Sequence, residues 1–264
     1  METAILHQIL AAIFCGALSG FSLGLIGGGG SVLAVPMLIY LVGMSDPHMA
    51  IGTSALAVSL SAFVNLVPHA RSGHVRWRMA GLFALAGVGG ALVGSTLGKL
   101  LNGQKLLLLF ALVMMLVAVL MVRRRTAGDD RATCQGSDCF LRVGGAGVTV
   151  GALAGFFGIG GGFLVVPGLI LSTGMPIIEA VGSSLVSVGA FGLTTAGNYA
   201  ASGLVDWMVA AEFIGGGVVG GWAGMRMAKR LAGSRKALNY VYAATVFSVG
   251  VYVMVRNLSA IGLS

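Results

Sequence analysis

Two glycine-rich turns are the residues of this sequence best suited to bind a ligand. The runs Gly27–Gly30 and Gly160–Gly162 each follow an apolar stretch, and a proline, Pro36 or Pro167, comes within six residues of each run. A helix that starts after such a turn presents unpaired N–H groups and a partial positive charge. Glycine there lets a ligand approach the backbone closely. The pattern therefore predicts an anion site bordered by Gly28, Gly29, Gly30, Ser31, Gly160, Gly161 and Gly162.

Neutral side chains are the other candidate ligands of this site. No Lys or Arg lies in the middle of any predicted membrane span, so the remaining donors are Ser54, Asn65, Ser183, Ser184, Thr194, Thr195 and Asn198. Helix dipoles and neutral donors suit a small oxyanion that must be bound and then released. Two simpler interpretations stay open: each hydroxyl bonds its own helix, and the glycine runs serve close helix packing.

Glu212 is the acid placed deepest in a predicted membrane segment. It lies five residues past Asp206-Trp207, which is about 7–8 Å along a helix. Burial of a carboxylate favours its neutral form, so a group that gains and loses a proton there could couple transport to protons. The alternatives are a neutral side chain bonded to a neighbouring helix, and a side chain that reaches back to the interface.

The composition dictates where these residues must sit. The chain has 264 residues, of which 57% are hydrophobic and 9% charged, with a mean hydropathy of +0.96. Soluble domains are about 25% charged, so a soluble enzyme, a secreted disulfide scaffold and a disordered chain are excluded. The net charge of +8 fits basic membrane loops rather than nucleic-acid binding.

Charge-free stretches predict the membrane segments. They are residues 3–45, 47–70, 79–98, 106–122, 143–178, 180–205 and 237–255, with a further span at 207–227 that contains Glu212. Because a crossing needs about 20 residues, we expect 3–45 and 143–178 to break at their glycine runs. The second parts, about 31–43 and 163–174, are then short helices.

The sequence contains an internal duplication. Residues 20–44 and 151–175 are identical at 12 of 25 aligned positions, including Pro36/Pro167 and Met44/Met175. At an offset of 130, Trp77 also matches Trp207. We expect a first membrane repeat at 1–125, a polar cytoplasmic linker at 126–142 and a second membrane repeat at 143–264.

The basic residues predict that the repeats are inverted. If the loop after the third segment, the linker and the loop after the ninth segment share one side, that side holds 13 of the 16 Lys and Arg residues. Parallel repeats would give nine against seven, which is no asymmetry. Inversion requires an odd number of crossings per repeat. The prediction is an all-α polytopic membrane protein with about five helical segments per repeat and both termini outside the cytoplasm.

The two glycine–proline segments resemble the twin signatures of the TauE/SafE family, also called the sulfite exporter or toluene sulfonate uptake permease family. The resembling segments are Gly24–Pro36 and Gly155–Pro167, and the duplicated plan extends the resemblance over nearly the whole chain. The resemblance implies a bacterial or archaeal inner-membrane carrier for sulfite, thiosulfate, or organosulfonates such as sulfoacetate. The mismatches Gly28/Ile159 and Ser31/Gly162 leave the two half-sites non-identical.

Inverted repeats also recur in secondary transporters, which bind substrate at the repeat interface near the midplane. We therefore expect a transporter of a small sulfur-containing anion, with protons as a possible coupling ion, as a monomer or homodimer. A carrier of another anion such as a carboxylate, and a membrane scaffold subunit, are the alternatives. An enzyme is not expected, because the histidines show no ligand spacing with carboxylates. We expect no metal or cofactor.

Overall fold

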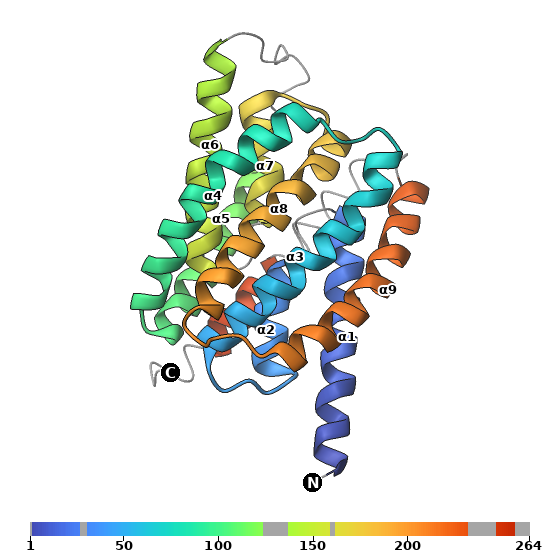
Figure 1. Cartoon of the computed structure of the whole chain (residues 1–264), viewed down its shortest axis with the longest axis vertical. Helices are drawn as coiled ribbons and strands as arrows, with labels where there is room; N and C mark the ends of the chain where they lie inside the picture. The colour runs from blue at the N-terminus through green and yellow to red at the C-terminus, as the bar shows by residue number, and fades with distance from the viewer. Residues whose placement is uncertain (1, 27–30, 124–136, 159–161, 232–246, 257–264) are drawn as a thin grey trace.

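The computed structural model is helical over most of its described part, in which no residue is assigned to a strand (Figure 1). The described residues are 2–26, 31–123, 137–158, 162–231 and 247–256. In chain order the labelled helices are α1 (Glu2–Ile26), α2 (Ser31–Tyr40), α3 (Pro47–Arg71), α4 (Trp77–Leu100), α5 (Gly103–Arg123), α6 (Ser137–Phe157), α7 (Gly162–Thr173), α8 (Ile177–Ala200) and α9 (Trp207–Leu231). A further short helix covers Phe247–Arg256.

Six of these helices are long and apolar enough to cross a membrane, namely α1, α3, α4, α6, α8 and α9. This confirms the predicted all-α polytopic membrane protein. The helices after the glycine runs are short, with 10 residues in α2 and 12 in α7. A helix of that length reaches about 15–18 Å, roughly half of a bilayer core. The broken helices are therefore where the sequence predicts them.

Packing between the helices follows the repeats. Helix α1 packs on α9, and α4 packs on α6, which are equivalent pairings after exchange of the two repeats. The long central helices α3 and α8 pack on each other. Figure 1 shows α1 leading from the N-terminus at one end of the molecule, whereas α6 begins at the opposite end. The first helix of each repeat thus runs in the opposite direction, as inverted repeats require.

Glycines hold the outer helix pairs together. A Cβ on Gly20 of α1 would lie 2.1 Å from the Gly217 carbonyl oxygen of α9. The equivalent Gly151 of α6 would meet the Gly87 carbonyl oxygen of α4, also at 2.1 Å. No side chain fits at such a distance, so these glycines let the backbones touch, as in small-residue interfaces of membrane helices. The glycine-rich composition therefore serves helix packing at these positions.

The approximate twofold axis passes between the middles of α3 and α8. The Ser59 hydroxyl donates to the Gly189 carbonyl at 2.6 Å, and these two positions are equivalent in the repeats. A direct contact between equivalent positions lies on the symmetry axis. Two further hydrogen bonds are symmetric: the Arg76 N–H donates to Ser183 Oγ, and the Asp206 N–H to Thr53 Oγ1, both at 2.9 Å.

These two symmetric bonds lie at opposite ends of the α3–α8 pair. Thr53 is near the start of α3, and Asp206 follows the end of α8. The start of each central helix therefore lies beside the end of the other, so α3 and α8 are antiparallel. In the linker region, α6 begins at Ser137, inside the predicted linker 126–142. Residues 124–136 are outside the described part.

Candidate functional site

A buried helix start follows each of the two glycine breaks. Gly28, Gly29, Gly30, Gly160 and Gly161 are outside the described residues. The residues that follow them, Ser31 and Gly162, begin α2 and α7 as predicted, and both are buried. These two half-helices also contact each other. The predicted pair of helix starts therefore lies inside the protein, on two elements that meet.

Gly158 joins the second break to the first repeat. Its φ is +68°, in the left-handed region that favours glycine. A Cβ at this position would lie 1.8 Å from Cγ2 of Ile51 on α3. The chain directly after α6, at Gly158, therefore lies against the central helix of the other repeat.

The described residues that flank the breaks are apolar and buried. Phe157 and Phe163 flank the second break, and the Phe110 ring lies 5.7 Å and 6.2 Å from their ring centroids. Leu25 and Val32, which flank the first break, belong to the same buried cluster. Electrostatic interactions are stronger in such a low-dielectric environment than in water. A partial charge at either helix start would therefore act strongly on an anion.

Ser54 and Ser184 bond their own helices. Ser54 Oγ donates to the Ile51 carbonyl at 2.9 Å, and Ser184 Oγ donates to the Val181 carbonyl at 2.8 Å. The two bonds are equivalent in the repeats and both serines are fully buried. This is the simpler of the two interpretations that the sequence leaves open for hydroxyls.

A row of buried polar residues follows each central helix. On α3 the row is Ser61, Asn65 and His69, at successive four-residue steps that keep side chains on one helix face. On α8 the row is Ser187, Thr195 and Tyr199, with the apolar Phe191 at the step between Ser187 and Thr195, and Ala57 is the α3 counterpart of Ser187. The polar members of both rows are buried. Hereafter they are called the α3 row and the α8 row.

The two rows lead to opposite ends of the molecule. The middle of α3 is at Ser59 and the middle of α8 is close to Gly189. Each row starts near this crossing and continues into the C-terminal half of its helix. Because α3 and α8 are antiparallel, the α3 row leads to one side of the membrane and the α8 row to the other.

Both rows lie at contacts between the repeats. A Cβ on Gly217 of α9 would lie 2.5 Å from Ser61 Oγ, and one on Gly221 would lie 2.3 Å from Asn65 Oδ1. In the α8 row, the Phe191 ring occupies the space above Gly87 of α4, at 2.1 Å from such a Cβ. Helices α9 and α4 belong to the opposite repeat in each case. Glycine in these helices therefore makes room for the row residues.

Several hydroxyls of the rows have no hydrogen-bond partner within the described part of the chain. They are Ser61 Oγ, Ser187 Oγ, Thr195 Oγ1 and the Tyr199 hydroxyl. A buried polar group without a partner costs about 1–3 kcal/mol, and hydrocarbon offers no water in its place. These hydroxyls therefore keep unused hydrogen-bonding capacity inside the protein.

The two asparagines of the predicted site lie far apart along the bundle. Asn65 belongs to the α3 row and donates from Nδ2 to the Ser61 carbonyl at 2.9 Å. Asn198 lies in the last turn of α8, where it bonds Lys99, Ser95 and Thr96. The structure therefore does not bring Asn65 and Asn198 to one ligand. It brings Thr195 and Asn198 to the same half of α8.

Some residues of the rows are absent from the sequence-based site. Ser61, Ser187, His69 and Tyr199 are missing from it, although their spacing contains a usable signal. Polar residues at four-residue steps inside an apolar segment share a helix face. Comparison of the two repeats at an offset of 130 pairs Asn65 with Thr195 and His69 with Tyr199, which would have indicated the rows.

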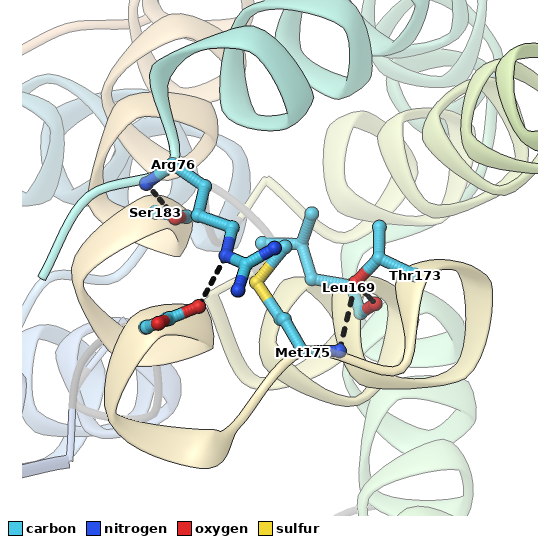
Figure 2. Close-up of polar contacts among 6 residues, drawn as sticks. Arg76, Leu169, Thr173, Met175 and Ser183 are labelled. Atoms are coloured by element: carbon cyan, nitrogen blue, oxygen red, sulfur yellow. Dashed lines mark hydrogen bonds and ion pairs between the residues drawn. The ribbon is translucent and has the colours of Figure 1, made fainter. Parts of the chain in front are cut away.

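At the end of the molecule where α8 begins, Arg76 connects the repeats (Figure 2). Its backbone N–H bonds Ser183, and its guanidinium forms an ion pair with Glu179 in the first turn of α8. Nearby, Thr173 Oγ1 donates to the Leu169 carbonyl and accepts from the Met175 N–H, which closes the end of α7. Among the described residues Arg76–Glu179 is the one ion pair.

Glu212 lies outside both rows. It is partly exposed on α9, beside a strongly exposed strip that includes Met208, Val219 and Trp222. No hydrogen bond or ion pair to Glu212 is found within the described part of the structure. A bond to a neighbouring helix is therefore not seen in this part of the structure, which leaves proton coupling and a side chain that reaches back to the interface as the interpretations of this acid.

The fold and this site define a multi-pass membrane transporter built from two inverted repeats, with buried polar groups where the repeats meet. A model of the family described as "Sulfite exporter TauE/SafE" matches residues 12–253. The chain belongs to this family.

Curated relatives agree with this assignment. A "Probable membrane transporter protein" of Xylella fastidiosa is 49% identical over 253 residues, which are 96% of this chain and 97% of the relative. The "Probable membrane transporter protein YunE" of Bacillus subtilis is 26% identical over 240 residues, which are 83% of this chain and 88% of YunE. No solved structure matches the chain significantly.

Proposed function

We propose that this protein is a secondary transporter of a small sulfur-containing anion, such as sulfite, thiosulfate or an organosulfonate like sulfoacetate. The membership in a sulfite exporter family supports the substrate class. The observation that carries the proposal is the pair of polar rows, because they place unpartnered hydroxyls at the repeat interface. A carrier of a different anion, such as a carboxylate, is the alternative; a scaffold subunit would have no use for such rows.

In the proposed mechanism the anion binds near the crossing of α3 and α8. The N–H groups at the starts of α2 and α7 supply partial positive charge there without a cationic side chain. Donors of the α8 row lead to this region from one side, and donors of the α3 row lead away from it to the other. Neutral donors replace part of the water around the anion, and they bind it weakly enough that it can be released again.

Alternating access follows from the symmetry in this proposal. The two equivalent bonds, Arg76 N–H to Ser183 and Asp206 N–H to Thr53, close opposite ends of the repeat interface. Rocking of one repeat against the other about the Ser59–Gly189 contact would open one end while the other stays closed. The Arg76–Glu179 ion pair adds to the closure of one end only.

Coupling to protons is part of the proposal, with Glu212 as the candidate carrier of the proton. The proposed location is the inner membrane of a bacterium or archaeon, with both termini outside the cytoplasm. The basic loops, among them residues 71–78, then face the cytoplasm, as the positive-inside rule demands.

Flux measurements with pure protein in proteoliposomes test this function. Sulfite, thiosulfate, sulfoacetate and acetate are offered on one side, with and without an imposed pH difference. We expect uptake of at least one sulfur anion above that of empty liposomes, and a larger uptake of that anion with the pH difference. Uptake of acetate alone would mean that the substrate is a carboxylate and not a sulfur anion. Absence of all flux would refute transport.

A further inference from the structure

Lys99 lies beside the end of the α8 row, where helix α4 ends toward the same end of the molecule as the N-terminus (Figure 1). It belongs to the last turn of α4. Its Nζ donates to the Asn198 carbonyl at 3.0 Å, to Asn198 Oδ1 at 2.8 Å and to Ser202 Oγ at 2.9 Å. The ammonium also lies 5.8 Å from the centroid of the Tyr199 ring.

Lys99 forms no ion pair within the described part of the chain, and the acidic charge found near it is that of Asp46, which acts on Tyr199. All three of its hydrogen-bond acceptors are neutral, and the only ion pair there joins Arg76 to Glu179. Asp46, at the start of α3, accepts a bond from the His48 N–H and forms no ion pair with Lys99. A partly buried ammonium whose hydrogen-bond acceptors are all neutral attracts anions.

Buried polar atoms without partners occur on Tyr199, whose ring lies near this ammonium, and on residues close to Tyr199. The Tyr199 hydroxyl is one, on a side chain with 0% exposure, and Thr195 Oγ1 follows one turn further into the protein. His48 lies 6.3 Å from the Tyr199 ring between centroids; its Nε2 bonds the Leu101 carbonyl, and its Nδ1 is buried without a partner. The charge of Lys99 and the unpartnered hydroxyls of Tyr199 and Thr195 therefore occur in one region of the protein.

The hydrogen bonds of Lys99 allow one acceptor to be exchanged. Asn198 is fixed, because its Nδ2 donates to Ser95 Oγ at 2.6 Å and to Thr96 Oγ1 at 3.1 Å. Ser202 is exposed, and its hydroxyl, which accepts from Lys99, itself donates to the Asn198 carbonyl at 3.4 Å. An anion can thus take the place of Ser202 on Lys99 while Asn198 holds the ammonium.

We propose that Lys99, Asn198 and Tyr199 form a capture site for a small oxyanion at the outer end of the α8 row. This extends the proposed function, because the site is where the anion first binds before it reaches the helix starts near the crossing. Lys99 supplies charge, Asn198 positions it, and the Tyr199 hydroxyl donates to a second oxygen of the anion.

Thermal unfolding of the purified full chain in detergent tests the capture site. Sulfite, thiosulfate, sulfate and acetate are titrated against the wild type, Lys99→Gln, Tyr199→Phe and the control Lys105→Gln. Lys105 is an exposed lysine near Lys99 in sequence. The quantity compared is the anion concentration that gives half of the maximal rise in the unfolding midpoint. We expect it to rise about tenfold or more in Lys99→Gln and severalfold in Tyr199→Phe, and to stay unchanged in Lys105→Gln.

The outcomes separate this site from the proposed function. If anions stabilise Lys99→Gln as they stabilise the wild type, the site is overturned and the transport proposal stands. If only acetate stabilises the wild type and Lys99→Gln loses that effect, the site is supported and the sulfur substrate is refuted. Absence of any response in the wild type overturns the site. If Lys99→Gln does not fold, Tyr199→Phe decides, since its hydroxyl has no bond to lose, and a wild-type response in that variant overturns the site.

Discussion

Ser59 and Gly189 are equivalent residues of the two repeats, and a 2.6 Å hydrogen bond joins them across the symmetry axis. In the proposed mechanism this contact is the pivot about which the repeats rock. Its position at the middles of α3 and α8 keeps it at the same place while the ends of the two helices exchange contacts.

We predict that Ser59→Ala lowers the free energy of unfolding by about 0.5–1.5 kcal/mol, the usual contribution of one hydrogen bond. The reason is the loss of the only side-chain bond on the axis within the described residues. The measurement is the midpoint of thermal unfolding in detergent. Thr149→Ala, whose hydroxyl bonds its own helix at the Gly145 carbonyl, is the control and should change the midpoint less.

Gly20→Leu should destabilise the protein strongly, because a side chain there overlaps the Gly217 backbone. Overpacking costs about 1–3 kcal/mol and more where backbone blocks relaxation. Gly89→Leu is the matched control, since nothing lies within 4 Å of a Cβ at that glycine. Equal unfolding midpoints for the two variants would contradict the packing of α1 on α9.

The sequence predicts that the glycines of the two breaks border the anion, and these glycines lie outside the described residues. Gly30→Leu and Gly161→Leu should insert and fold but lose anion-dependent thermal stabilisation, because bulk at the helix starts excludes the anion. Gly145→Leu, at an open position on α6, should keep the stabilisation. Wild-type anion affinity in both break variants would mean that the runs serve packing alone.

Thr195→Val should reduce transport without loss of stability. The change removes a hydroxyl that has no partner in the described structure, so no protein hydrogen bond is lost. Loss of one bond to the ligand, about 1–1.5 kcal/mol, corresponds to roughly a five- to tenfold lower kcat/KM for flux. Thr194→Val is the comparison, because the Thr194 hydroxyl already bonds the Ala190 carbonyl; an equal loss of flux in both would argue against the α8 row.

Glu212→Gln tests proton coupling. The substitution keeps the shape of the side chain and removes its titration, so accumulation of anion in response to an imposed pH difference should disappear, whereas downhill exchange should remain. The assay is uptake into proteoliposomes with and without the pH difference. Accumulation at the wild-type level would show that Glu212 does not carry the proton.

Much of the architecture is encoded locally in the sequence. Apolar stretches near the length of a bilayer force the backbone into helices, because hydrocarbon leaves no other partner for its N–H and C=O groups. The glycine runs end α1 and α6, so the starts of α2 at Ser31 and α7 at Gly162 follow directly. The uneven placement of Lys and Arg then determines that the repeats are inverted.

Only the tertiary structure decided which polar residues act together. Asn65 and Asn198 look alike in the sequence, but Asn65 faces Gly221 of α9, whereas Asn198 bonds Lys99 of α4 at the other end of the bundle. The physical reason is that both contacts join different repeats. Helix rotation and the packing of glycine faces set such pairings, and neither follows from the spacing of residues within one segment. The sequence by itself thus determined the helices, their breaks and their inversion, while packing between the repeats decided where a ligand can be held.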